Sequence, residues 1–373
     1  MPVPDFVALA QPGIRSLRAY DPGLDLVALR RADRAGVLVE LGSNENSHGP
    51  SPAARAAILD SLHALHRYPD PLGGDLKRAL AARHGVAASG IALGNGSHEL
   101  LMMLAQVFAG PGLEVVASRF GFAVYALAAQ AAGASLRWAE SLPAGHAMAR
   151  GHDLHAILGA IGPATRLVYL ANPNNPTGTW FAASALAAFM ADVPDNVIVV
   201  VDEAYLEYAT DPALLSAATL LNAYSNLVVT RTFSKGYALA GLRVGYLLAA
   251  PGLVAVLERV RESFNVNGPG LAACEAALAD KEHLDWVCRK NASEREALCD
   301  ALRARGIAVS PSQTNFLLVD FGRDATPVES GLVDRGVVPR PMSGYGLPTC
   351  LRITVGNRDE NRRFLQALDE VLA

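Results

Sequence analysis

The chain has 373 residues, of which 51% are hydrophobic and 18% charged, with a formal net charge of −4 at pH 7. This length suits a large enzyme subunit or two to three domains with a deep core. The negative net charge gives no indication of a nucleic-acid-binding protein. The first residues do not resemble a secretory signal and no apolar run reaches the ~20 residues that span a bilayer, so we expect a cytoplasmic protein without membrane partners.

The first two parts of the chain differ in composition. Residues 1–36 are rich in proline, glycine and arginine and predict an N-terminal arm with one short helix near 24–31. Residues 37–250 alternate apolar strands with helices, which is typical of an α/β domain with a mostly parallel sheet. The expected strands cover 37–41, 91–93, 114–117, 136–139, 167–171, 197–201, 227–230 and 244–249. The expected helices cover 53–65, 75–84, 98–108, 123–132, 152–160 and 182–190.

The pattern changes after Pro251. Residues 253–305 predict a long helical region that breaks near 267–270, where Asn, Gly, Pro and Gly follow one another. Short strands are expected at 308–309, 315–320, 337–338 and 351–355, before a final helix at 361–372. Residues 251–373 therefore predict a smaller α+β domain. The four cysteines form no C-x-x-C pair, so we expect no metal site.

Polar side chains follow four of the expected strands. Ser97, Asn172, Asp202 and Lys235 each come at or just beyond a strand end. Ligands of parallel α/β sheets bind beyond the carboxyl ends of the strands. The sequence therefore predicts one site at this edge of the sheet.

Three of these positions have chemistry of their own. The turn at 94–97, Gly-Asn-Gly-Ser before a helix, suits a phosphate, although a plain tight turn is the alternative. Asp202 follows a β-branched strand and needs a positive partner if it is buried. That partner belongs either to a ligand or to a structural salt bridge within the protein. Lys235 lies beside Ser234 and eight residues before Arg243. A lysine held near cations and away from water has a lowered pKa and can act as a nucleophile.

Several segments together resemble a known family. They are SNEN, RYPDP, GNGSHEL, ANPNNPTG, VVVDEAYLEY, TRTFSKGYALAGLRVGY and LRITVG, in this order. From about Gly36 to the C-terminus the chain resembles the fold-type-I pyridoxal-phosphate aminotransferases, and within them the histidinol-phosphate aminotransferase family. The resemblance implies a large cofactor-binding domain, pyridoxal 5'-phosphate as cofactor, and a ping-pong cycle between L-glutamate and histidinol phosphate in histidine biosynthesis.

The resemblance also implies roles for individual residues. Lys235 is the amine that forms a Schiff base with the cofactor's aldehyde, and Asp202 faces the ring nitrogen. Asn172 and Tyr205 match the positions of donors to the ring's phenolate oxygen. The cofactor's phosphate and ring face are expected to contact Ser97, His98, Thr232, Ser234, Arg243 and Phe122.

Further residues are implied at the substrate and at the partner subunit. Tyr68 matches a tyrosine that reaches the phosphate of the neighbouring subunit's cofactor, which implies a homodimer with sites at the interface. Arg340 and Arg352 match anion-binding positions for the substrate. Tyr20 in the arm is similar to a tyrosine that covers the substrate, and Asn46 is expected to face the site.

Other functions remain open on sequence grounds. An aromatic amino-acid aminotransferase or a phosphothreonine-type decarboxylase of the same fold needs the same cofactor contacts. A nicotinamide oxidoreductase is suggested by Gly94-x-Gly96, but the third glycine of that fingerprint is replaced by Glu99. A non-catalytic cofactor-binding regulator needs a DNA-binding segment, for which the first 36 residues are too few and not basic.

Overall fold

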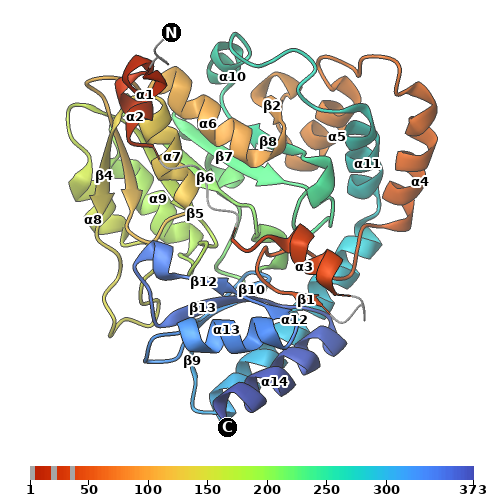
Figure 1. Ribbon diagram of the computed structural model, residues 1–373. Coiled ribbons are helices and arrows are strands. Elements are labelled where there is room, and N and C mark those ends of the chain that lie inside the picture. Colours follow the sequence, from red (N-terminus) through yellow and green to blue (C-terminus); the bar gives the residue numbers. More distant parts are fainter. Residues whose placement is uncertain (1–4, 18–22, 34–37) are drawn as a thin grey trace.

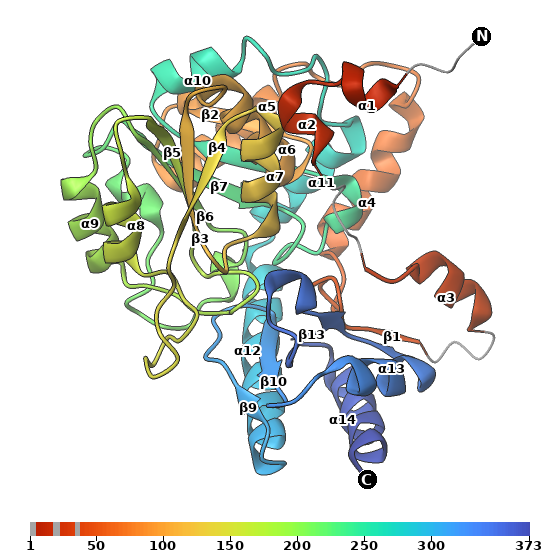
Figure 2. The same cartoon turned by 60° about the vertical axis from the view of Figure 1, so that its left-hand side comes forward.

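The computed structural model describes residues 5–17, 23–33 and 38–373. It has a seven-stranded sheet flanked by helices and, below it in Figure 1, a smaller sheet with its own helices. The short helices of the arm are α1 (Phe6–Leu9), α2 (Pro12–Arg15) and α3 (Leu26–Ala32). Helices α1 and α2 lie beside the large sheet's helices, whereas α3 lies near the small sheet (Figure 2).

The large sheet has the strand order β2-β8-β7-β6-β5-β3-β4. Only β8 runs against its neighbours, so the prediction of a mostly parallel sheet is confirmed. The strands are β2 (Ile91–Gly94), β3 (Glu114–Ser118), β4 (Ser135–Ala139), β5 (Thr165–Ala171), β6 (Ile198–Asp202), β7 (Leu227–Thr232) and β8 (Gly245–Leu248).

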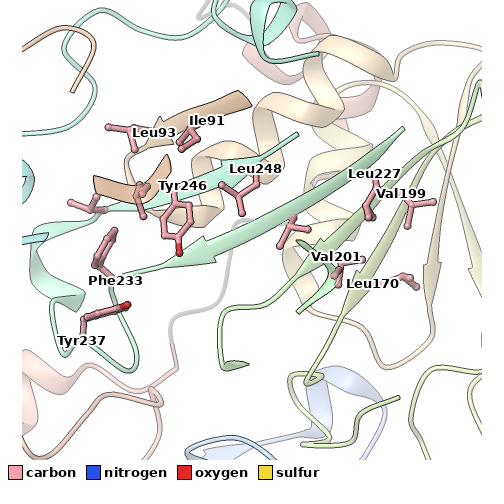
Figure 3. Close-up of a cluster of buried hydrophobic side chains, with 14 of the residues drawn as sticks. Ile91, Leu93, Leu170, Val199, Val201, Leu227, Phe233, Tyr237, Tyr246 and Leu248 are labelled. Carbon is pink, nitrogen blue, oxygen red and sulfur yellow. The ribbon is translucent and has the colours of Figure 1, made fainter. Parts of the chain in front are cut away.

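Helices cover both faces of this sheet, because its central strands are apolar on both sides. One face packs against α6 (Gly96–Phe108), α7 (Ala123–Ala131) and α10 (Pro251–Leu257). The other packs against α4 (Pro52–Ser61), α5 (Gly74–His84), α8 (Leu154–Ala160), α9 (Ala183–Asp192) and α11 (Gly268–Ala279). Figure 3 shows the second of these cores, in which Leu170, Val201 and Leu248 are among the buried side chains.

Local signals explain where several helices begin and end. Ser51 caps α4, accepting a hydrogen bond from the Ala54 amide at 3.1 Å, and Pro52 takes the first helical position. Gly85 ends α5 in the left-handed conformation, with φ of 65°. Both X-Pro bonds of the loop after β5, Asn172-Pro173 and Asn175-Pro176, are cis.

The small sheet has the order β12-β13-β10-β9 and is antiparallel. Its strands are β9 (Ala308–Val309), β10 (Phe316–Asp320), β12 (Arg340–Pro341) and β13 (Cys350–Thr354). Alternate residues of β10 and β13 pack against α12 (Lys281–Ala304), α13 (Thr326–Asp334) and α14 (Arg358–Leu372). The opposite face of the sheet is turned toward the large part of the molecule.

Two elements link the large and small parts. Strand β1 (Val39–Glu40) pairs with β11 (Val337–Val338) rather than with the large sheet. The 24-residue helix α12 places Leu284 in the large core and Leu298 in the small one. The proposed division into 1–36, 37–250 and 251–373 follows the sequence pattern. In the structure, α10 and α11, which belong to the third range, pack on the large sheet.

The helical region expected at 253–305 is three helices in the structure. Helix α10 ends at Leu257, so residues 258–267 are not helical, and a second break at Asp280 separates α11 from α12. The expected break at 267–270 is instead the start of α11, which Asn267 caps by accepting a hydrogen bond from the Gly270 amide at 2.7 Å. In the described part of the chain, no helix is both long and apolar enough to cross a membrane.

Candidate active site

A cavity of about 860 Å³ opens between the two parts of the molecule, at the carboxyl ends of the parallel strands. Its lining brings together most of the residues singled out in the sequence. Those that line it are Ser97, His98, Phe122, Asp202, Tyr205, Thr232, Ser234, Lys235, Arg243, Arg340 and Arg352. They come from four strands, the starts of α6 and α7 and the loops between elements, over 256 positions of sequence from Ser97 to Arg352.

Lys235 lies in the loop after β7 and is held by backbone carbonyls. Its Nζ donates to the carbonyl oxygens of Ser43 and Asn44, both at 3.1 Å, and lies 5.7 Å from the centre of the Tyr205 ring. Burial and, to a smaller extent, the nearby guanidinium of Arg352 lower the pKa of Lys235 to about 8. The expected lowered pKa therefore has burial as its main cause and a nearby cation as the second.

Asp202 is a buried carboxylate at the end of β6. The hydroxyl groups of Tyr125 and Thr230 donate to it at 3.2 and 3.1 Å, and no ion pair joins it to a cation among the described residues. Burial raises its pKa to about 6. A buried carboxylate without a counter-charge is costly, so this site favours a ligand that brings a positive group to the bottom of the cavity.

The start of α6 and the end of the lysine loop form a small polar cup. Arg243, which has a left-handed φ of 57°, donates from Nη1 to the Ser234 hydroxyl at 3.4 Å. Gly96, with φ of 78°, leaves the space that the Arg243 guanidinium occupies, and Gly245 lets β8 approach the Ser97 amide. Asn95 makes no side-chain cap at the start of α6, and the first backbone amides of a helix favour an anion. We call Ser97, His98, Thr232, Ser234 and Arg243 the phosphate cup.

Two arginines face each other on the opposite wall. Arg340 and Arg352 are directly paired across β12 and β13, so their side chains leave the same face of the small sheet and both line the cavity. Arg352 donates to the Asn175 side chain and to the Gly42 carbonyl, both at 2.6 Å. Like charges directly opposite are unfavourable, so this pair favours an anionic ligand.

The position of Asn172 does not match its predicted role. Its amide side chain makes two 3.0 Å hydrogen bonds with the backbone of Phe181, and it is not part of the cavity lining. The lining contains Asn175 instead, three residues further along the same loop. Both asparagines precede a proline in ANPNNPTG, so sequence alone gave no reason to choose the second one.

Asn46, Tyr68 and Tyr20 also lie outside the lining. Asn46 donates to the carbonyl oxygens of Lys235 and Gly236, at 3.3 and 3.1 Å, so it holds the lysine loop rather than facing the cavity. Tyr68 is 82% exposed and stacks on Phe264, with ring centres 4.6 Å apart. Tyr20 falls outside the described residues.

Two residues at the site were not among those predicted from the sequence. Tyr125, on α7, contacts Asp202 as described above. Asn44 has a left-handed φ of 55° and is buried; its side chain donates to the Tyr205 hydroxyl at 3.0 Å, while its carbonyl accepts from Lys235. Asparagine tolerates this conformation better than most residues, which is the one sequence clue that was available.

Known proteins resemble this chain over nearly its whole length. The family model described as aminotransferase class I and II matches residues 37–368. Histidinol-phosphate aminotransferase 2 of Pseudomonas aeruginosa is 49% identical over 371 residues, 99% of each chain. The crystal structure of histidinol-phosphate aminotransferase from Sinorhizobium meliloti in complex with pyridoxal-5'-phosphate is 34% identical, with a TM-score of 0.85 over 97% of each chain. The L-threonine-O-3-phosphate decarboxylase of Porphyromonas gingivalis is 23% identical and shows the fold alone: its TM-score is 0.78, over 90% of this chain and 99% of that one.

Proposed function

We start from the fact that this chain belongs to the class I and II aminotransferase family, and we propose that it is a histidinol-phosphate aminotransferase. It transfers an amino group between L-glutamate and the keto form of histidinol phosphate, in histidine biosynthesis in the cytoplasm. The observation that carries the proposal is the presence of Lys235 and Asp202 in one cavity whose lining also holds a phosphate cup and an arginine pair.

The residues present fit pyridoxal phosphate. Among the described residues no cation pairs with the buried Asp202 carboxylate, and a protonated ring nitrogen would supply one. The phosphate cup would offer a guanidinium, hydroxyls and backbone amides at the start of α6 to a phosphate. Phe122 lies at the cavity wall, edge-on to Tyr125 with ring centres 5.9 Å apart, where it can contact a flat ring.

When bound, pyridoxal phosphate supplies an aldehyde that combines with amines and a ring that takes up electrons. The chain's own groups do the rest. With a pKa of about 8, roughly a tenth of the Lys235 amine is neutral at pH 7, and Nζ can accept the proton that leaves the substrate carbon and return it. The Asp202 carboxylate would hold a protonated ring nitrogen by its charge. We propose Tyr205, and Asn175 in place of Asn172, as the groups that face the ring's oxygen.

Substrate recognition falls to the small sheet and the arm. Histidinol phosphate carries a phosphate, and glutamate carries two carboxylates, so one arginine pair can bind both substrates in turn. We propose Arg352 as the fixed anion ligand, because Asn175 and the Gly42 carbonyl hold its guanidinium in place. Arg340 is the second, and Tyr20 is proposed to cover the substrate.

We propose a homodimer whose active sites lie at the interface. Large apolar side chains are exposed around Tyr68, which is unusual for a surface that meets only water. They are Leu59, Leu62, Leu65, Leu72, Val260 and Phe264. In the dimer, Tyr68 contacts the phosphate of the partner's cofactor.

A half-reaction screen tests the function. The purified enzyme is loaded with pyridoxal phosphate and mixed in single turnovers with L-histidinol phosphate, L-glutamate, L-phenylalanine or O-phospho-L-threonine. We expect the absorbance of the bound cofactor to be lost rapidly with the first two, and no release of carbon dioxide with the last. Equal rates with L-phenylalanine favour an aromatic aminotransferase, and carbon dioxide release favours a decarboxylase; either result contradicts the proposal.

A further inference from the structure

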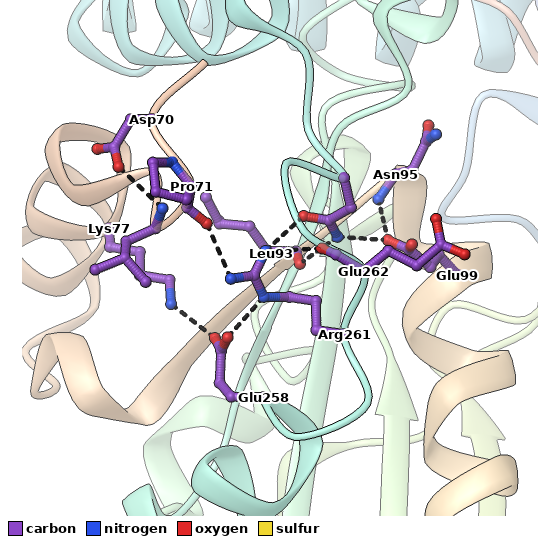
Figure 4. A network of polar contacts seen from close by, with 11 residues as sticks. Asp70, Pro71, Lys77, Leu93, Asn95, Glu99, Glu258, Arg261 and Glu262 are labelled. Carbon is purple, nitrogen blue, oxygen red and sulfur yellow. Dashed lines mark hydrogen bonds and ion pairs between the residues drawn. The ribbon is translucent and has the colours of Figure 1, made fainter. Parts of the chain in front are cut away.

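The segment from Glu258 to Asn267 connects α10 to α11 and contains a continuous polar network (Figure 4). We call it the bridging segment. It contacts the loop that carries Tyr68 on one side and, on the other, Leu93, Glu99 and Leu242, which lie beside the phosphate cup. Neither the aminotransferase chemistry nor the substrate contacts described above use its side chains.

On the Tyr68 side, the central group is Arg261, whose side chain is 10% exposed. Its Nη2 donates to the Pro71 carbonyl at 2.9 Å, which fixes the end of the Tyr68 loop. Glu258 accepts from Arg261 at 2.6 Å and from Lys77 at 2.9 Å, so the guanidinium has a carboxylate partner. Next to this contact, Phe264 stacks directly on the Tyr68 ring.

On the cup side, the central group is Asn265. Its Nδ2 donates to the Leu93 carbonyl at 3.2 Å and to the Glu99 carboxylate at 2.8 Å. That same carboxylate oxygen accepts from the Asn95 amide at 2.5 Å, directly before α6 begins. This explains why Glu99 stands where a dinucleotide-binding loop has glycine: its side chain anchors the turn.

The second wall of the cup is held by the same segment. Asn267 Nδ2 donates to the Leu242 carbonyl at 2.8 Å, immediately before Arg243. The two sides are joined inside the segment, because Arg261 Nη1 donates to Asn265 Oδ1 at 2.8 Å. Phe264 has a left-handed φ of 60°, an unfavourable conformation for an aromatic residue, which the contacts on both sides maintain.

We propose that Arg261 is a positioning residue that acts through Tyr68: the bridging segment fixes Tyr68 relative to the subunit's own phosphate cup. In the dimer, each cofactor phosphate then meets the cup of one subunit and the tyrosine of the other. The segment therefore ties the geometry of one active site to that of its neighbour. This inference rests on the proposed homodimer and its shared sites.

The test is a double-mutant cycle read out as affinity for pyridoxal phosphate. The apo forms of wild type, Tyr68→Phe, Arg261→Gln and the double variant are titrated with the cofactor by equilibrium dialysis, after chromatography confirms equal oligomeric state. We expect Tyr68→Phe and Arg261→Gln each to weaken binding about three- to tenfold, the usual effect of one lost hydrogen bond. In the Tyr68→Phe background, Arg261→Gln should weaken cofactor binding by less than about a further twofold, because the effects of residues that act together are not additive.

Two further variants separate positioning from a general loss of structure. Phe264→Leu removes the stacking on Tyr68 but leaves the polar network intact, and it should show the same non-additivity. Arg305→Gln is the matched control, because Arg305 also binds a carboxylate, that of Asp369 at 2.6 Å, on the surface of the small part. It should leave cofactor affinity unchanged.

The outcomes distinguish this inference from the proposed function. Equal losses from Arg261→Gln in both backgrounds, or no loss in wild type, overturn the positioning role while leaving the shared site standing. If Tyr68→Phe itself has no effect on cofactor affinity, the proposed sharing of the phosphate between subunits is wrong, and the inference falls with it. Should Arg261→Gln fail to fold, the Phe264→Leu cycle gives the decisive comparison.

Discussion

Replacing Asp202 with asparagine should make the cofactor-free protein more stable and the enzyme nearly inactive. The pKa of this carboxyl is raised by burial from the ordinary 3.8 to about 6. The folded state therefore binds more protons than the unfolded state between these pH values, and stability is lost as pH rises through this window. Above pH 6 the charged carboxylate costs about 3 kcal/mol, the free-energy equivalent of that pKa difference.

An amide of the same shape removes this cost but cannot accept both hydroxyl donors. Tyr125 and Thr230 each donate to one carboxylate oxygen, and losing one of these hydrogen bonds costs about 1 kcal/mol. The net gain for Asp202→Asn is then about 2 kcal/mol at pH 8. For a protein of this size it corresponds to an increase of about 3 °C in the unfolding midpoint.

The assay is thermal unfolding of the two apo proteins, at one concentration, between pH 4 and pH 8. The midpoint of the variant should exceed that of wild type at pH 8, and the difference should disappear toward pH 4. With saturating pyridoxal phosphate, turnover should fall at least about 100-fold, equivalent to a loss of about 3 kcal/mol of transition-state stabilisation. A variant less stable than wild type at pH 8, or a difference independent of pH, would refute the assignment of a buried, unpaired carboxylate.

Four further outcomes follow from the site. Lys235→Ala should abolish turnover while circular dichroism and oligomeric state stay unchanged; normal turnover contradicts its role as the reacting amine. Cofactor uptake by the apo enzyme, followed by stopped-flow absorbance, should speed up as pH rises through about 8, and Arg352→Gln should move this midpoint upward because it removes a cation that lowers the pKa. Arg340→Gln should raise KM for histidinol phosphate about tenfold or more, with less effect on kcat, and an effect on kcat alone argues against an anion contact. Tyr125→Phe should weaken cofactor binding about three- to tenfold in titrations, and an unchanged affinity shows that its hydroxyl does not support Asp202.

The sequence predicted the large sheet and most of the cavity lining. The strands ending near Asp202 and Thr230 are β-branched and buried on both faces, so their pattern is unambiguous. The carboxyl ends of parallel strands meet at one edge, which is why residues as distant as Ser97 and Lys235 could be expected together.

What the sequence did not predict depends on contacts between distant segments. Asn172 bonds to Phe181, whereas Asn175 bonds to Arg352 at the cavity wall, and this difference decides which asparagine lines the cavity. Residues 258–267 have enough apolar and charged residues to continue a helix. They do not continue helix α10 because the side chains of Arg261 and Asn265 donate to the carbonyl oxygens of Pro71 and Leu93. Local helix propensity does not predict such distant contacts.

The arrangement of the cavity also bears on how such enzymes diversify. The amine, the buried carboxylate and the phosphate cup all belong to the large part of the molecule, whereas the arginine pair lies on the small sheet. Substitutions in β12 and β13 can therefore change which anion is accepted without disturbing the groups that hold the cofactor. A gene duplicate of this protein could acquire a new amino donor through a few changes near residues 340–352 and keep its chemistry intact.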